Sequence, residues 1–213
     1  MKNYTFLILI LFFSCEQKVK SGSNVNAAKS NSTIPLKIPK EEDSILNAWS
    51  HYYQKENPNF KPELFLLKET SPISYRESSI YILHQKGFNE IYKPFLVFSK
   101  SRDHYLDFDS YNWFIDPNGN AGYEADQQVV VVDLKKKSAK QIAFFGPSFW
   151  VEDAYWKGDS VAVLLGNSYE KIPFKMEFNF KTNKAKNYIY PDTLKFETPY
   201  SKIRLRSKGI KVE

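Results

Sequence analysis

Short apolar runs separated by turn residues dominate the chain beyond residue 62. Six of the runs are three to five residues long and rich in Val, Ile, Leu and Phe, which is typical of β-strands. They occupy residues 65–67, 80–83, 95–98, 129–132, 142–145 and 161–165. In residues 174–180, apolar and polar side chains alternate strictly, as on a strand with one face on a core and one in water. The pattern therefore predicts a chain built mainly of short strands.

The segments between these runs predict how the strands pair. Residues 135–138, 157–160 and 181–184 are short, polar and rich in Lys, Gly, Asn and Ser, which is the chemistry of compact hairpin turns. Hairpins join neighbouring strands in antiparallel order. We therefore predict an all-β fold, mainly an antiparallel meander arranged as an open sheet or a sandwich.

The rhythm of strands and turns over residues 128–190 is similar to that of β-propeller blades. No repeat of fixed period accompanies it, and only three or four blades would fit the chain. A small or degenerate propeller is therefore the alternative to the sheet or sandwich.

One amphipathic helix is expected at the start of the domain. Ile45, Leu46, Trp49, Tyr52 and Tyr53 fall on one helical face, acidic residues 41–43 favour a helix start, and a proline at 58 ends the pattern. A stripe with this spacing is typical of a face packed on a sheet. With 42% hydrophobic and 16% aromatic residues, the chain can build one core, so residues 41–213 are predicted to form a single, mainly-β domain with this flanking helix.

Apolar and basic residues also alternate near the C-terminus, in residues 202–206. This spacing predicts a strand with Ile203 and Leu205 on the core. Lys202, Arg204 and Arg206 would then line its open face and protect a sheet edge from pairing with another chain.

The first fifteen residues have the layout of a secretory signal. Lys2 precedes an apolar run at residues 6–13, which is too short to span a bilayer, and Ser14 and Cys15 follow. This arrangement resembles the lipobox of a bacterial lipoprotein, whose cysteine becomes the acylated first residue of the mature protein. The resemblance implies that residues 1–14 are a signal peptide and that lipid on Cys15 anchors the protein in the cell envelope. Glu16 in place of aspartate then favours the outer membrane.

Residues 15–40 are predicted to be the lipidated, flexible tether of this domain, because their composition is mostly polar and offers little to bury. Cys15 is the only cysteine, so the mature domain has no thiol for a disulfide, a thiolate metal site or a nucleophile. The formal charge of +6 falls only to +5 without Lys2. We expect this charge mainly to keep the domain soluble and to protect sheet edges, and attraction to acidic glycans or anionic head groups is the alternative.

Carboxylates, amides and aromatic rings are densest in residues 103–126. Rings beside carboxylates and amides are typical of surfaces that bind sugars or proteins, but the same rings can fill a core, and strand alternation should bury about half of them. The candidate ligand or partner surface consists of Asp107, Asp109, Tyr111, Trp113, Asp116 and Tyr123.

Two other chemistries compete for the same segment. Asp107 and Asp109 would share one face of a strand and could serve a hydrolase acting on glycan or peptidoglycan. Asp116, Asn118 and Asn120 have the first spacings of a calcium loop, but the later glycine and glutamate are out of place, and the same residues make an ordinary turn.

Because no catalytic motif accompanies these residues, we expect a non-catalytic binding or interaction module. We assign no catalytic residues, no metal and no cofactor to it. The expected partners are the membrane, through Cys15, and an envelope protein or glycan; nucleic acid is not expected.

The anchor is tested by metabolic labelling. Radiolabelled palmitate should enter the wild-type protein and not the Cys15→Ala variant, because acylation requires the thiol. Equal labelling of the two proteins would show that the anchor prediction is wrong.

Overall fold

The computed structural model describes residues 40–213, with side chains from residue 44 onward. The predicted signal peptide, Cys15 and nearly all of the predicted tether lie outside the described residues. No helix in the described part of the chain is long and apolar enough to cross a membrane.

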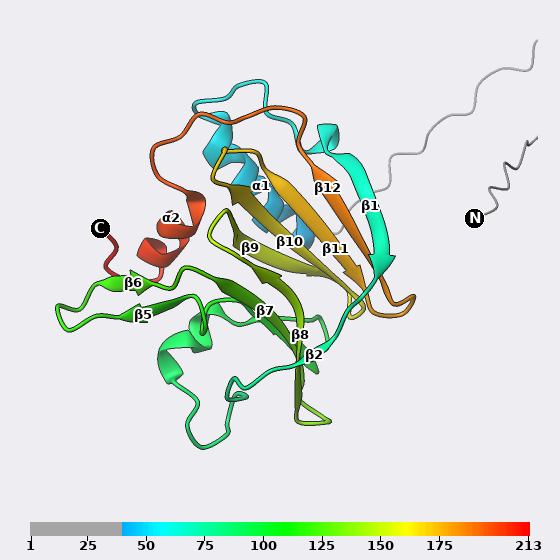
Figure 1. Cartoon of the computed structure of the whole chain (residues 1–213), viewed down its shortest axis with the longest axis vertical. Coiled ribbons are helices and arrows are strands. Elements are labelled where there is room, and N and C mark those ends of the chain that lie inside the picture. The colour runs from blue at the N-terminus through cyan, green and yellow to red at the C-terminus, as the bar shows by residue number, and fades with distance from the viewer. Residues whose placement is uncertain (1–39) are drawn as a thin grey trace, which may run out of the picture. The chain divides into compact units, whose positions relative to one another are not determined.

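Two five-stranded sheets face each other, and every pairing within the sheets is antiparallel (Figure 1). The first sheet has the order β1 (Leu66–Pro72), β12 (Lys184–Ile189), β11 (Phe174–Asn179), β10 (Val161–Ser168) and β9 (Phe149–Lys157). The second has the order β2 (Arg76–Glu77), β8 (Ser138–Phe145), β7 (Gln127–Asp133), β4 (His104–Asp107) and β3 (Val97–Phe98). A hairpin of β5 (Trp113–Ile115) and β6 (Ala121–Tyr123) forms a third, two-stranded sheet.

The main core lies between the two large sheets. Leu106, Val129 and Ile142 of the second sheet pack in one cluster with inward-facing residues of the first, such as Leu164 and Phe178. The all-β prediction is therefore confirmed in its sandwich form. Residues 128–190 supply strands to both facing sheets instead of propeller blades.

The predicted helix is present as α1 (Lys40–Gln54), and it covers the outer face of the first sheet. Trp49 and Tyr53 are almost completely buried, against Tyr155, Val163 and Leu165 of β9 and β10. The i, i+4 spacing of the two rings places both on the side facing the strands.

The outer face of the second sheet is covered by an irregular segment and not by a further strand. A strand was expected at residues 80–83, yet this stretch pairs with no other strand. Ile82 and Leu83 are buried over the sheet, and the backbone N–H of Leu83 donates to the hydroxyl of Tyr105. A side chain therefore supplies the partner that a neighbouring strand would have provided. The run at 95–98 is also shorter than predicted, because the 3-10 helix η2 (Glu90–Phe95) takes its first residue; a second 3-10 helix, η1 (Pro62–Leu64), precedes β1.

The C-terminal strand prediction is wrong, because residues 202–206 belong to helix α2 (Tyr200–Ser207). Arg204 and Leu205 are both buried, which a strand with one wet face does not allow for adjacent residues. Leu205 packs with Phe95 and Trp113, and Arg204 pairs with the buried Asp109. These two residues are therefore buried against different partners, and the segment does not line a sheet edge.

A buried carboxylate ties both helices to the first sheet. Glu152 on β9 is fully buried and accepts hydrogen bonds from Trp49 Nε1 at 2.8 Å and Tyr53 Oη at 2.7 Å, both on α1. It also accepts from Trp150 Nε1 at 3.2 Å and from the backbone N–H of Tyr200, at the start of α2, at 3.0 Å. Burial raises the pKa of Glu152, although these donors act to lower it.

The pKa shift of Glu152 makes stability depend on pH. A pKa above the unfolded value of about 4.3 means that the folded state holds the proton of Glu152 more tightly than the unfolded state does. The part of the unfolding free energy that comes from this proton is therefore lost as the pH rises. We expect the free energy of unfolding of the wild type to fall between pH 4 and pH 8 relative to Glu152→Gln, as measured by urea denaturation.

Glu177 on β11 is the matched control. Although burial opposes the shift, ion pairs with Lys157 and Lys175 lower the pKa of Glu177. The wild type should therefore gain stability with pH relative to Glu177→Gln, the opposite sign. A difference between wild type and Glu152→Gln that stays flat or rises with pH would contradict the assignment.

Candidate functional site

Three of the six predicted surface residues lie in the interior. Asp107, Asp109 and Trp113 are each at most 3% exposed, so the prediction that they form a ligand surface is wrong. Asp107 ends β4 and stabilises the following turn: its carboxylate accepts the N–H of Asp109 at 3.1 Å, and the N–H and hydroxyl of Ser110 at 3.0 and 2.7 Å. Burial raises the pKa of Asp107.

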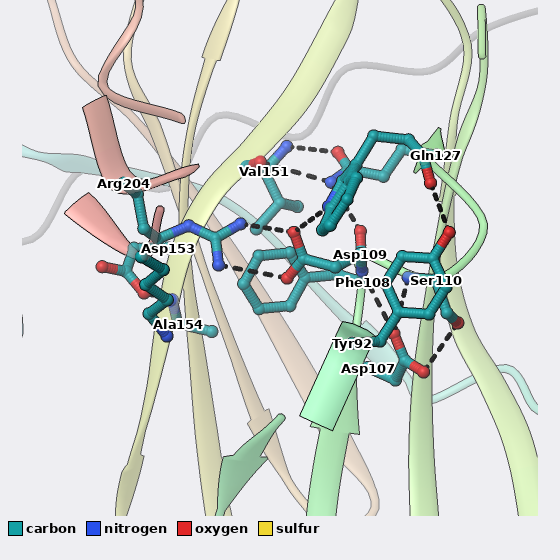
Figure 2. A network of polar contacts seen from close by, with 12 residues as sticks. Tyr92, Asp107, Phe108, Asp109, Ser110, Gln127, Val151, Asp153, Ala154 and Arg204 are labelled. Atoms are coloured by element: carbon teal, nitrogen blue, oxygen red, sulfur yellow. Dashed lines mark hydrogen bonds and ion pairs between the residues drawn. The ribbon is translucent and has the colours of Figure 1, made fainter. Parts of the chain in front are cut away.

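Asp109 is held by an arginine from the far end of the chain. The guanidinium of Arg204 donates to both carboxylate oxygens, at 2.7 and 3.1 Å, and the indole of Trp113 donates at 2.9 Å (Figure 2). Arg204 also lies over the rings of Phe95 and Phe108, at 5.6 and 4.8 Å from their centroids. This buried pair joins α2 to the second sheet, and together with Trp113 it engages both carboxylate oxygens of Asp109.

The other three predicted residues are more accessible, and one of them, Tyr123, lies directly across the β5–β6 hairpin from the buried Trp113. Tyr111 is 43% exposed and packs edge-on to Phe144, while Tyr123 is 40% exposed on β6. Asp116 is in the turn between β5 and β6, where its Oδ1 accepts the N–H groups of Asn118 and Asn120. The turn interpretation of this segment is therefore confirmed. Among the described residues, no cluster of three or more acidic, His or Cys side chains could hold a metal ion.

A sizeable cleft of the described domain lies elsewhere. A cleft of about 920 Å³ opens between α1, the segment from η2 through β3 to residue 102, strand β9 and helix α2. Lys100, Arg102, Asp153, Arg204 and Lys208 are its charged lining residues, and we call it the cationic cleft. Ser99, Tyr155, Tyr200 and Ser207 contribute hydroxyls to its lining.

The inner wall of the cationic cleft is formed by Asp153 and Arg204. Burial raises the pKa of Asp153, whose carboxylate accepts the N–H of Ala154 at 2.8 Å. Although burial opposes it, the carboxylates of Asp109 and Asp153 raise the pKa of Arg204. Figure 2 shows the Arg204 guanidinium turned toward Asp109, with Asp153 on its other side. The Nε atom of Arg204 is buried and has no hydrogen-bond partner within the described chain.

Three more cations lie on the outer parts of the cationic cleft. Burial and the nearby Arg204 lower the pKa of Lys208, which donates to the carbonyl of Pro94. Arg102 places its guanidinium 4.0 Å from the ring centroid of Phe98 and has a φ of 62°. A non-glycine residue in the left-handed region costs roughly 1–2 kcal/mol, which the surrounding structure must offset. That conformation brings Arg102 to the cleft beside Lys100.

Sequence reasoning missed this site because its parts are far apart in the chain. Residues 95–102, 153–158 and 200–208 meet only in the folded protein, and Arg204 was assigned to a strand edge. The acidic pair in 152–153, two charges inside an otherwise apolar strand, was the only local signal.

Comparisons with protein-family models, with curated proteins and with solved structures found no match to the chain. The argument for function therefore rests on the geometry of the described residues.

The buried pair is tested by removing one partner. Arg204→Met leaves the Asp109 carboxylate buried without its counter-ion, which should cost about 3–5 kcal/mol of unfolding free energy in urea denaturation. The double variant Asp109→Leu/Arg204→Met should recover much of that loss.

The exposed pair Glu90–Lys93 is the control, and Lys93→Met should change stability by no more than about 0.5 kcal/mol. If Arg204→Met costs as little as Lys93→Met, the pair does not hold α2 in place.

Proposed function

We propose that this protein is a non-catalytic binding module of the cell envelope, anchored by lipid on Cys15, and that its cationic cleft binds an acidic oligosaccharide. The proposal rests on one observation: four cationic side chains and a single carboxylate line the cleft. Because Arg204 is paired with Asp109, the imbalance comes from Lys100, Arg102 and Lys208 against Asp153. That imbalance attracts anions, and the cleft volume lies within the range of about 300–1,000 Å³ common for ligand sites.

The remaining lining of the cationic cleft suits a saccharide. The hydroxyl of Tyr200 can donate to and accept from sugar hydroxyls, the hydroxyl of Ser207, which donates to the carbonyl of Arg204, can accept from them, and the guanidinium of Arg102 presents a planar fork to a carboxylate. The placement at the outer membrane follows from the lipobox resemblance, and the acidic glycans of an envelope are the partners within reach of such an anchor.

The competing proposal is a hydrolase that uses Asp107 and Asp109. Neither side chain lines any of the cavities found in the described domain, and their oxygens are engaged by Ser110, Trp113 and Arg204. A general acid or base needs reach to its substrate, and this geometry does not offer it. The binding role is therefore favoured.

Calorimetric titration tests the binding role. The mature full chain in neutral detergent should bind tetragalacturonate and not the uncharged cellotetraose, and the affinity should fall as salt is raised, because screening weakens the charge contacts. Chromatography of the recovered sugar should show it intact.

The matched variants locate the site. Lys100→Gln/Arg102→Gln should weaken binding on the order of tenfold, because two charge-assisted contacts are lost. Lys184→Gln/Lys186→Gln removes the same charge from exposed β12 and should have little effect. Equal losses in both variants would indicate nonspecific attraction, and cleaved sugar would favour the hydrolase.

A further inference from the structure

A second hollow lies inside the sandwich, at the end where β7, β9 and β11 finish. It has a volume of about 700 Å³ and is lined from both large sheets: by residues of β4, β7 and β8 on one side and by Trp156 and Phe180 on the other. We call it the inter-sheet cavity. It opens directly off the main core, because Val131, Trp156 and Phe180 belong to the cluster that fills the sandwich.

The walls of the inter-sheet cavity are apolar. The rings of Trp156 and Phe180 lie 5.5 Å apart, and Val131 and Tyr75 add further apolar surface. The indole N–H of Trp156 donates to the carbonyl of Val97 at 2.9 Å, so that polar atom is already engaged. Such walls favour a hydrocarbon chain over a polar ligand.

The mouth of the inter-sheet cavity carries more cations than available acids. Asp133 and Asp159 are both engaged: Asp133 pairs with Lys136 at 3.2 Å, and Asp159 accepts the N–H of Ser101 at 2.6 Å. His104 Nε2 lies 3.5 Å from Oδ2 of Asp133, so this imidazole is already engaged, whereas Lys181 forms no ion pair among the described residues. An anionic head group would therefore find an unpaired cation, Lys181, at the rim, next to an apolar interior.

We propose that the inter-sheet cavity binds a single-chain anionic amphiphile, a long-chain carboxylate. Its hydrocarbon chain lies between the sheets against Trp156 and Phe180, and its carboxylate lies at the mouth near Lys181. This site is separate from the cationic cleft, and the binding of acidic sugars there is not needed for it.

Photo-crosslinking tests the inter-sheet cavity directly. The mature full chain, held in amphipol, is irradiated with a diazirine-bearing dodecanoate, and the labelled peptides are identified by mass spectrometry. Labelling should fall on segments that line the cavity, such as 131–140 and 156–160. Unlabelled carboxylates should compete more strongly by up to about fourfold per added methylene, because each buried methylene contributes a constant increment.

Three variants distinguish the contribution of the ligand's hydrocarbon chain from that of its carboxylate. Val131→Trp fills the cavity and should abolish labelling, while thermal unfolding and near-UV circular dichroism show whether the variant is folded. Lys181→Glu, at an exposed position, should weaken labelling by about threefold to tenfold, and Lys186→Glu on β12 should not.

Two other probes test whether the bound hydrocarbon chain belongs to a carboxylate, to a cationic amphiphile or to a phospholipid. A diazirine-bearing dodecyltrimethylammonium should not label the cavity, since its head group is repelled at the mouth. Equal labelling by this cation, or stronger labelling by a diazirine-bearing phosphatidylcholine, would overturn the proposal. So would the absence of any label in the cavity segments, or labelling that persists in folded Val131→Trp. None of these results bears on the galacturonate titration.

Discussion

The architecture depends on two buried carboxylates, one on β9 of the first sheet and one just after β4 of the second, that both accept hydrogen bonds from the same C-terminal helix. Glu152 on β9 accepts the N–H of Tyr200, and Asp109, after β4, accepts both arms of Arg204. An unpaired charge in this interior would cost several kcal/mol, so the positions of α2 and of both sheets are set together. The cationic cleft exists because α2 is held there, between β9 and β3.

These pairs also explain why a domain without disulfides keeps an ionic site so close to its core. Hydrophobic packing alone tolerates many arrangements of similar volume, whereas a bidentate arginine and carboxylate pair accepts one. Arg204 serves both purposes: its terminal nitrogens hold Asp109, and its side chain also lines the cleft. A structural pair thus forms part of the inner wall of the cleft.

The sequence predicts those parts of the fold whose signals are local and long. The spacing of Trp49 and Tyr53 placed α1 on the sheet, and the alternation in 174–180 placed β11, because in each case periodicity and burial agree. Residues 202–206 failed for the opposite reason. Five residues fit both periods, and the contact that decides between them joins Arg204 to Asp109, 95 positions earlier. No local pattern records such a contact.

The candidate site was even less accessible to sequence reasoning. An acidic and aromatic segment looks the same whether its carboxylates face water or accept hydrogen bonds inside, and in this protein Asp107 and Asp109 do the latter. The cleft, by contrast, gathers Lys100, Asp153 and Lys208 from three separate stretches. The composition shows that the chain is positively charged. Which of its cations meet in one cleft is decided by the strand register and by the position of α2.

Trp156 lies in the walls of both the cationic cleft and the inter-sheet cavity. A shared side chain couples two sites only if a ligand in one of them changes its position, since coupling requires different interactions in two states. Trp156 is fixed on both sides, by its hydrogen bond to Val97 and by its packing on Phe180. Both contacts are made with the protein's own strands or with the turn beside them, so they are present whether or not a ligand is bound. The indole therefore acts as a rigid partition, and occupancy of one site should leave the affinity of the other unchanged.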